Sequence, residues 1–441
     1  MKKIIILFSF CGLSFVWMSV AAQSPAGMGG YVESSFAKGD SAGRVATDWD
    51  DYEKYRIGSY GEMLFNRMNY GPNRYKSPDG APRDNRSYIT IPRTVFAGDY
   101  KFRDDIILST EIEFEYGGTG AAMEYEYTEA GEYEGFEVEK AGEVALEQFH
   151  ITKRFFPWLN VRVGHFIVPV GITNAHHEPV FFFGTSRPEG ERALLPSTWH
   201  ETGISILGYL RGFKYEVMLV NGLSPNGFST ENWVGSGKQG VLEDVVTTHP
   251  AVAARVEYSG IKNLRLGLSG YYGNTTKNTT KPAYAGLKGT VSIFSADAQY
   301  NSKNFTMRAN IIYGDLTDSK AISEENRRLF RSTFGATTVA KNAMTYAVEA
   351  GYNVFSLLDM KTKLYPFVRY EYYNTAQNVE NGVKEFPRFK RDLTTFGFNY
   401  FLLPNLTLKA DYAIRRIDNG NYNSEHTFSA GVAYTTWFFN K

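Results

Sequence analysis

The sequence predicts an all-β chain that forms a transmembrane antiparallel β-barrel of about sixteen strands with short periplasmic turns and long extracellular loops. Apolar residues alternate with small or polar ones over most of the chain, which is typical of strands with two different faces. The last such row is Phe428, Ala430, Val432, Tyr434, Thr436 and Phe438. The chain also holds 30 Tyr, 32 Phe and 42 Gly, which suits a barrel with aromatic girdles at both membrane interfaces.

The first segment, 1–22, has the pattern of a secretory signal peptide. Lys2 and Lys3 precede an apolar run of about a dozen residues, and small residues near Ala22 suit cleavage. That run is too short to span a bilayer comfortably. Because the only cysteine lies within it, the exported chain is expected to have no disulfide. We expect 23–51, which is rich in Gly and Ser, to be a flexible segment, and 52–441 to form the barrel.

Charge and hydropathy argue against two other classes of protein. Without Lys2 and Lys3, the 47 basic residues fall to 45 against 47 acidic ones, a net charge of −2. A nucleic-acid-binding protein would be expected to carry a basic excess. The mean hydropathy is −0.32, and beyond residue 22 no apolar run is long enough for a membrane-spanning helix.

The alternating segments predict individual strands. In chain order they are 56–68, 93–102, 105–117, 147–155, 160–171, 202–212, 213–223, 251–260, 264–273, 290–301, 304–315, 343–355, 362–373, 393–402, 406–416 and 428–439. Short turns join them in pairs, and the pairs are separated by long polar loops at 69–87, 118–142, 172–200, 223–249, 274–289, 316–342, 374–391 and 418–425. This segregation of loop lengths is typical of outer-membrane barrels. The last strand must pair with the first, because an open edge in lipid leaves backbone groups unsatisfied.

The predicted inward rows carry charges of both signs. The candidate pore-lining residues are Arg162, Arg255, Arg265, Arg308, Arg369, Lys409, Glu111, Glu113 and Glu115. A barrel of about sixteen strands generally leaves an aqueous channel, and such a lumen would be hydrated. An alternative stays open, in which the charges pair with one another and only keep the interior wet.

Three segments carry a resemblance to a known family. They are "IGSYGEMLFNR" (57–67), "VRVGHFIVPVG" (161–171) and "ERALLPSTWHETGISILG" (191–208), and in order and spacing they resemble the phosphate-selective porin O and P family. The resemblance implies an outer-membrane porin, commonly a trimer, with one loop folded inward and basic residues that guide anions. The chain departs from that pattern at His165, where relatives often have arginine, and in the many acidic residues of its predicted lumen.

The loop at 172–200 is the candidate constriction loop. It contains "VFFF" (180–183), which is too apolar for a freely solvated loop and predicts burial inside the barrel or against a neighbouring subunit. Its candidate functional residues are His176, His177, Arg187, Arg192 and His200. The histidines could bind a metal with Glu178 and Glu201, or could become protonated and attract anions. We favour the simpler interpretation, in which they are ordinary polar residues of a constriction, and predict no metal and no cofactor.

The predicted function is that of a bacterial outer-membrane porin, an ion-transporting channel for passive diffusion of small hydrophilic solutes. Arg255, Arg265 and Arg308 would make it a weakly selective anion channel. The expected partners are membrane lipid, small solutes or anions, and further copies of the chain in a trimer; no nucleic acid is expected. No catalytic motif stands out, so we expect no enzyme. The alternatives are an adhesin or structural anchor and, with less support, a membrane-embedded lipid hydrolase.

Overall fold

The structure, a computed structural model, is a closed antiparallel β-barrel. It describes Trp49 and residues 51–70, 85–118, 121–127, 133–140, 142–239, 242, 244–328, 338–358, 360–383 and 387–441. The predicted signal peptide and nearly all of the segment 23–51 lie outside these residues. The strands that close the barrel run in the order β1-β18-β17-β16-β15-β14-β13-β12-β11-β10-β9-β8-β7-β6-β3-β2, which confirms the predicted fold class.

The barrel strands begin within a few residues of where the alternation predicts them, except β2, which begins at Asn85, eight residues before the predicted start and within the predicted loop 69–87. Their bounds are β1 (Tyr55–Asn69), β2 (Asn85–Arg103), β3 (Ile106–Glu115), β6 (Glu143–Phe156), β7 (Leu159–Ile167), β8 (His200–Leu210), β9 (Phe213–Val220), β10 (Ala251–Ile261), β11 (Leu264–Asn274), β12 (Thr290–Asn301), β13 (Phe305–Leu316), β14 (Asn342–Tyr352), β15 (Lys363–Asn378), β16 (Lys390–Leu403), β17 (Leu406–Ile417) and β18 (Glu425–Asn440). The register between β1 and β18 runs from Arg56↔Asn440 to Met68↔Thr427, so the last strand closes the barrel as expected.

The strands have one apolar and one polar face. On β11, Leu266 and Leu268 are 41% and 50% exposed, whereas the alternate residues Gly267 and Ser269 are buried. The same alternation leaves large hydrophobic side chains on the outside of strands all round the barrel. Such an outer band suits contact with lipid chains. Among the described residues, no helix is both long and apolar enough to cross a membrane.

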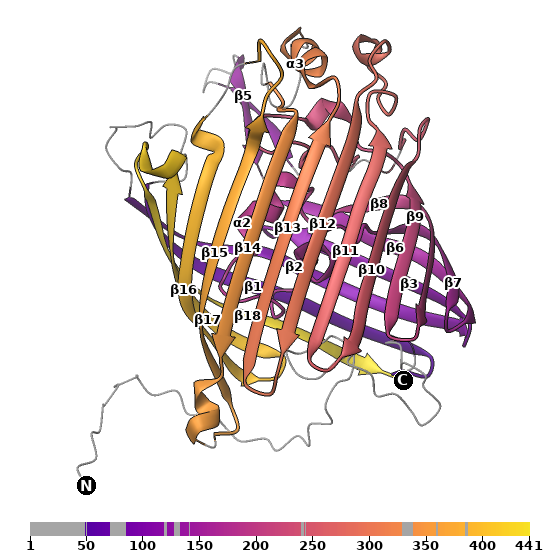
Figure 1. The fold of residues 1–441 in the computed structure, drawn as a ribbon, viewed down its shortest axis with the longest axis vertical. Helices are drawn as coiled ribbons and strands as arrows, with labels where there is room; N and C mark the ends of the chain where they lie inside the picture. Colours follow the sequence, from indigo (N-terminus) through magenta and orange to yellow (C-terminus); the bar gives the residue numbers. More distant parts are fainter. Residues whose placement is uncertain are drawn as a thin grey trace.

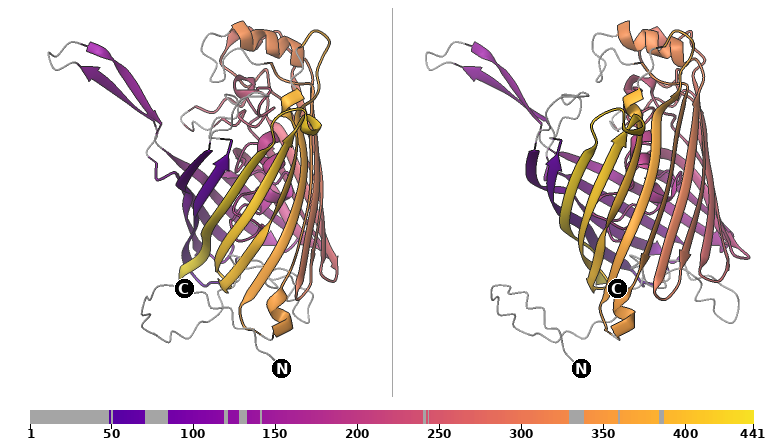
Figure 2. Two further views of the ribbon diagram at one scale, coloured as in Figure 1. Left: turned by 90° about the vertical axis from the view of Figure 1, so that its left-hand side faces the viewer. Right: turned by 60° about the vertical axis from the view of Figure 1, so that its left-hand side comes forward.

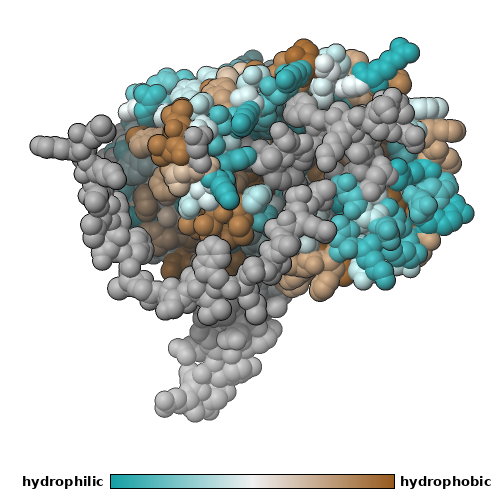
Figure 3. Space-filling view, turned by 90° about the horizontal axis from the view of Figure 1, so that it is seen from below, coloured by the Kyte–Doolittle hydropathy of each residue, from teal (hydrophilic) through white to brown (hydrophobic). Residues whose placement is uncertain are grey.

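The two ends of the barrel differ in their connections (Figure 1). Short turns at one end join strand pairs at 104–105, 157–158, 211–212, 262–263, 302–304 and 404–405. One connection at this end is longer, because 353–362 includes the short helix η4 (Val354–Leu358). Seen from this end, hydrophilic side chains alternate with patches of hydrophobic ones (Figure 3).

The long connections at the other end contain elements that the alternation of the barrel does not predict. β4 (Ala121–Tyr127) and β5 (Tyr133–Lys140) form a separate two-stranded hairpin between β3 and β6, where the sequence analysis expects only a polar loop. Figure 2 shows this purple hairpin projecting away from the barrel. The loop between β13 and β14 contains the helix α3 (Ser319–Arg328), which lies near the short helix η3 (Pro282–Tyr284).

A hydrophobic core lies inside the barrel rather than around it. Inward residues such as Phe166 of β7 and Ile312 of β13 pack in one cluster with residues from four long connections, including Trp199 and Trp233. Trp233 also donates a hydrogen bond of 3.1 Å from Nε1 to the backbone O of Ala340. This cluster fixes the long connections against one part of the wall, and it bears directly on the loop between β7 and β8.

Candidate functional site

The connection at 168–199, which we call the lumen loop, turns into the barrel instead of extending from its mouth. It joins β7 to β8 and contains the short helices α1 (Ile172–Ala175) and α2 (Glu189–Leu194). Gly171 makes the turn with φ of 83°, a conformation that L side chains rarely adopt, and a Cβ there would collide with the Glu191 carboxylate. In Figure 1, α2 lies at mid-height within the outline of the barrel.

The middle of the lumen loop is tied to the wall at β15, β16 and β17. Lys409 donates hydrogen bonds to the backbone oxygens of Phe182 and Gly184 at 3.0 and 2.8 Å, and also to that of Pro179. Arg369 donates to the backbone O of Phe183 at 2.9 Å. The Phe183 ring stacks on Phe367 with a centroid distance of 5.2 Å. The apolar "VFFF" stretch is therefore buried inside the barrel.

Other parts of the lumen loop reach the remaining wall. On one side, Tyr60 of β1 bonds His177, and Thr435 of β18 donates to Glu178 at 2.9 Å. On another, Arg265 of β11 lies 2.5 Å from Nε2 of His176. Because its contacts reach strands so far apart in the barrel order, the lumen loop crosses the interior.

Helix α2 is held by buried polar contacts. Glu189 pairs with Arg415 and accepts a hydrogen bond of 2.5 Å from the Tyr373 hydroxyl. Glu191 accepts hydrogen bonds of 2.8 Å from the backbone N–H groups of Thr173 and Asn174, and so satisfies donors at the start of α1. Burial raises the pKa of Glu191 to about 7, against the effect of these donors.

The candidate pore-lining residues lie on the inward rows, opposite the exposed apolar ones. Four of the five candidate arginines are paired with carboxylates. Arg255 bonds both oxygens of Asp297 at 2.8 and 2.9 Å and lies 2.8 Å from Glu257. The others pair as Arg162–Glu216 at 3.1 Å, Arg308–Glu349, and Arg369 with Glu371 at 2.9 Å and Glu349 at 3.6 Å. The geometry favours the alternative in which lumen charges neutralise one another. That these residues line a conducting path stays a prediction.

The two adjacent histidines of the lumen loop lie against arginines; His177 is buried and His176 is half-buried. Burial, and next the charge of Arg265, lowers the pKa of His176 to about 3. Burial, and next Arg93, lowers the pKa of His177 to about 3 as well. Both rings are therefore neutral at mildly acidic pH, which argues against the idea that they attract anions by protonation.

The remaining candidates of the constriction loop fall in different places. Arg187 donates to Thr198 Oγ1 at 2.9 Å within the loop. Arg192 is exposed and lines a cavity of 310 Å³ together with Arg391. His200 is the first residue of β8; its Nδ1 lies 2.5 Å from Nε2 of His165, and its Nε2 accepts a hydrogen bond of 2.9 Å from Lys238.

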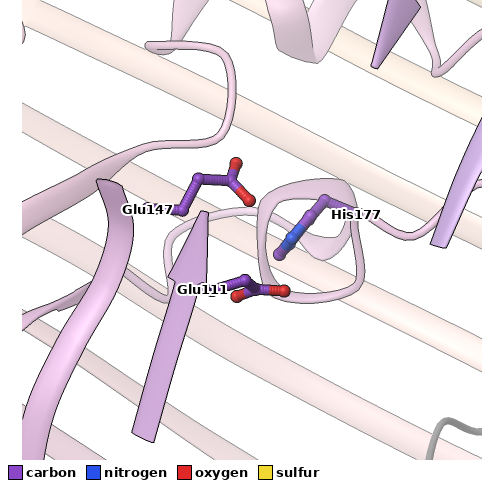
Figure 4. A group of neighbouring side chains, drawn as sticks. All are labelled: Glu111, Glu147 and His177. Atoms are coloured by element: carbon purple, nitrogen blue, oxygen red, sulfur yellow. The ribbon is translucent and has the colours of Figure 1, made fainter. Parts of the chain in front are cut away.

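One cluster in the described part of the chain has the composition of a metal site. Glu111 of β3, Glu147 of β6 and His177 of the lumen loop each offer one ligand atom, and these atoms lie within 4.8 Å of one another. Figure 4 shows the three side chains converging on a common space. This is a different set from the predicted metal alternative, because Glu178 bonds Thr435 and Glu201 bonds the Trp199 indole at 3.0 Å.

Sequence reasoning missed Glu147 and Tyr60 for physical reasons. The register of β3 with β6 passes from Glu111↔Gln148 to Ile112↔Leu146, so Glu147 is the extra residue of a β-bulge. A bulge changes which side of the sheet a residue faces, and strict alternation cannot reveal that. The alternation identifies Tyr60 only as a residue of the first strand. Its contact with His177 joins residues 117 positions apart, which no local pattern reveals.

Comparisons with known proteins agree with the fold. No family model matches the chain. A protein of Aquifex aeolicus (strain VF5), described as uncharacterized, is 26% identical over 385 residues, which are 87% of this chain and 79% of that protein. The chain is thus similar over most of its length to a protein whose description names no activity.

Three solved structures are similar in fold, each with a TM-score of 0.51. Salmonella typhi OmpF in complex with daunomycin is 9% identical, with 86% of this chain and 97% of that chain covered. The outer-membrane channel DcaP of Acinetobacter baumannii is 12% identical, with 87% and 98% covered. OprB of Pseudomonas putida is 11% identical, with 87% and 94% covered.

These likenesses define the class of the fold: the chain is a closed β-barrel similar in fold to outer-membrane porins, and its localisation is the bacterial outer membrane. The closed strand order and the apolar outer band agree with that localisation, because only a closed barrel satisfies all of its strand edges in lipid. At such low identities the likeness extends to the fold alone.

Proposed function

We propose that the chain is an outer-membrane porin that allows small hydrophilic solutes to diffuse passively. One observation carries this proposal: the closed barrel holds an internal loop that is fixed to inward-facing side chains on many strands. A fixed loop inside a wide barrel narrows the lumen, and pore width is one determinant of which solutes pass. The similarity in fold to the outer-membrane channel DcaP supports the proposal.

The finer proposal is a weak preference for anions. Because Arg255 and Arg308 of the wall are paired with carboxylates, we place this preference at less enclosed charges of the lumen loop, chiefly Arg192 and Arg187. Arg192 and Arg391 share a cavity with Glu189 and Glu231, so the local field there is mixed. A strong phosphate preference would need a row of unpaired basic residues, and the pairing described above does not favour one.

We further propose that the chain assembles as a trimer through its outer apolar face. Apolar side chains on the outside of the barrel would suit either lipid or a second copy. Chemical cross-linking in native membranes, compared with protein dispersed in excess detergent, would report the number of subunits. A monomer under both conditions would contradict the trimer and leave the pore unaffected.

The pore is tested by electrical and osmotic measurements on the purified protein. Reconstituted in planar bilayers, it should give stepwise conductance, and proteoliposomes should swell at rates that fall as the size of the test sugar rises. Preparations without the protein serve as the control. Folded protein that gives neither signal would overturn the proposal in favour of an adhesin or anchor, and release of fatty acid from the vesicles would favour the hydrolase.

A further inference from the structure

The cluster of Glu111, Glu147 and His177 brings three separate elements together inside the barrel. Glu147 is fully buried, Glu111 is 6% exposed and His177 is 8% exposed. Glu111 accepts a hydrogen bond from Gln148, and Glu147 and His177 share contacts with Tyr60. Carboxylates and imidazole are the oxygen and nitrogen ligands that divalent transition metals use in proteins.

The hydrogen bonds of the cluster leave a shortage of donors. Tyr60 has one hydroxyl hydrogen, but its oxygen lies 2.9 Å from Nε2 of His177 and 3.1 Å from Oε2 of Glu147. The second oxygen of Glu147, Oε1, is buried without any hydrogen-bond partner. A buried carboxylate without a partner is costly, so this oxygen points to a ligand that the side chains do not supply.

His177 is oriented as a metal ligand would be. Its Nδ1 lies 3.2 Å from the backbone O of Asn174, and because a carbonyl oxygen can only accept, Nδ1 carries the hydrogen. Nε2 is then the nitrogen with the free lone pair, and it is the nitrogen that faces Glu147 and Tyr60. Histidine ligands of metals are commonly fixed in this way through the other ring nitrogen.

The charge balance also favours a cation. Glu111, Glu113 and Glu147 lie close enough together to repel one another. The nearby cation Arg93 is engaged in part: it lies 3.6 Å from Glu62 and donates to the backbone O of His177, while its Nη1 is buried without a hydrogen-bond partner. A divalent ion between Glu111 and Glu147 would offset the repulsion that one shared arginine leaves uncompensated.

We propose that Glu111, Glu147 and His177 form a binding site for a divalent transition-metal ion, for which Zn²⁺ is the probe. Ligand atoms within 4.8 Å of one another would close in to bonds of about 2 Å, and water or the Tyr60 hydroxyl would complete a tetrahedral set. The ion would join the lumen loop to β3 and β6. This binding step does not depend on whether the barrel conducts.

The first experiment measures Zn²⁺ binding to the detergent-purified, metal-stripped chain by calorimetry and elemental analysis. We expect the wild-type chain to bind one Zn²⁺ ion tightly at this site and to bind no Mg²⁺ there. The affinity for Zn²⁺ should be at least about tenfold weaker in Glu147→Gln and in His177→Gln. His249→Gln is the matched control, because His249 is exposed and far from the cluster in the chain. Absence of binding, or equal affinity in all variants, would overturn the site.

The second experiment locates the ion and keeps the test independent of variant folding. Anomalous diffraction at the zinc edge from crystals of the wild-type chain should place the ion among Glu111, Glu147 and His177; an ion elsewhere would contradict the proposal. Zn²⁺ should also slow proteolysis of the lumen loop in the wild type and leave it unchanged in Glu147→Gln. Binding at this site by a chain that does not conduct would support the site and count only against the pore.

Discussion

Single buried side chains fix the lumen loop, and Lys409 shows how. It is 2% exposed, and its ammonium group donates to three backbone oxygens of the loop. Lys409→Met would keep a side chain of similar length and leave these three backbone oxygens without their hydrogen-bond donor. Hydrogen bonds to charged groups contribute about 1.5–3 kcal/mol each, partly offset by no longer burying the charge. We expect the loop to be cleaved faster by protease, with larger current fluctuations in single-channel recordings.

The control for this variant is Lys303→Met. Lys303 is exposed in the short turn between β12 and β13, outside the lumen loop. The Lys303→Met substitution changes the net charge by the same amount as Lys409→Met and removes no contact with the lumen loop. Equal protease sensitivity of the two variants would show that Lys409 does not hold the loop.

The lipid face and the lumen face of β11 should respond differently to substitution. Leu266 is 41% exposed on the outer face. Leu266→Arg should lower the free energy of unfolding by about 2–4 kcal/mol if the residue lies near the bilayer midplane. Urea titration in lipid vesicles, read from tryptophan fluorescence, would measure this. A change below the error of the titration would mean that the strand face or the depth of Leu266 is wrong.

Gly267 is a residue whose neighbours lead to a different prediction from alternation alone. As a lumen position it should accept a polar side chain at little cost, but an added Cβ would lie 2.5 Å from Arg255 Nη2 and 2.6 Å from both carboxylate oxygens of Asp297. The glycine leaves room for this ion pair. We therefore expect Gly267→Ser to destabilise the barrel. Unchanged urea midpoints would contradict this role for Gly267.

At the scale of elements, α2 couples the lumen loop to pH through Glu191. The pKa of this carboxyl is about 7 in the folded chain, above its usual value of 4.5, because of burial. The folded state therefore binds the proton more tightly, and this contribution to stability is present below pH 4.5 and lost as the pH rises through 7. Glu191→Gln should flatten that part of the profile, measured as the thermal midpoint between pH 4.5 and 7.5. A profile identical to that of the wild type would argue against the raised pKa.

The sequence predicts regular elements better than it predicts contacts between them. The strands and the closing pair of β1 and β18 follow from alternation, because lipid and lumen impose opposite chemistry on successive residues. The bulge at Glu147 and the hairpin of β4 and β5 do not, since each breaks the regular pairing of neighbouring barrel strands. The candidate residues of the lumen loop could be named, but their partners lie on distant strands that no local pattern identifies.

The whole molecule should behave as a barrel held by its closed hydrogen-bonded ladder. Because every barrel strand pairs on both sides, loss of structure requires many bonds to break together. Folded protein should give a β-dominated far-UV spectrum and should migrate faster on a denaturing gel before boiling than after it. The control is the full chain kept unfolded, with no lipid or detergent added to allow refolding. A mainly helical spectrum would contradict the fold.

Ion selectivity is a property of the whole molecule, and it depends on which charges remain unpaired. Arg255 is 6% exposed and bonded to Asp297 and Glu257, so its field is largely cancelled within the wall. Arg192 is exposed beside a cavity of 310 Å³, where a charge can act on passing ions. We therefore expect the double variant Arg187→Gln with Arg192→Gln to shift the reversal potential in a salt gradient toward cation selectivity.

The matched control for this prediction removes a charge pair from the wall. Arg255→Gln with Asp297→Asn leaves the net charge unchanged and should leave the reversal potential near that of the wild type. The effect of the loop variant should shrink with salt, because the Debye length falls from about 10 Å at 0.1 M to about 3 Å at 1 M. One outcome would contradict this prediction: at low salt the wall-pair variant shifts the reversal potential and the loop variant does not. Selectivity would then reside in the wall, as the sequence alone suggests for Arg255, and the ion pair with Asp297 would not have cancelled the charge of Arg255.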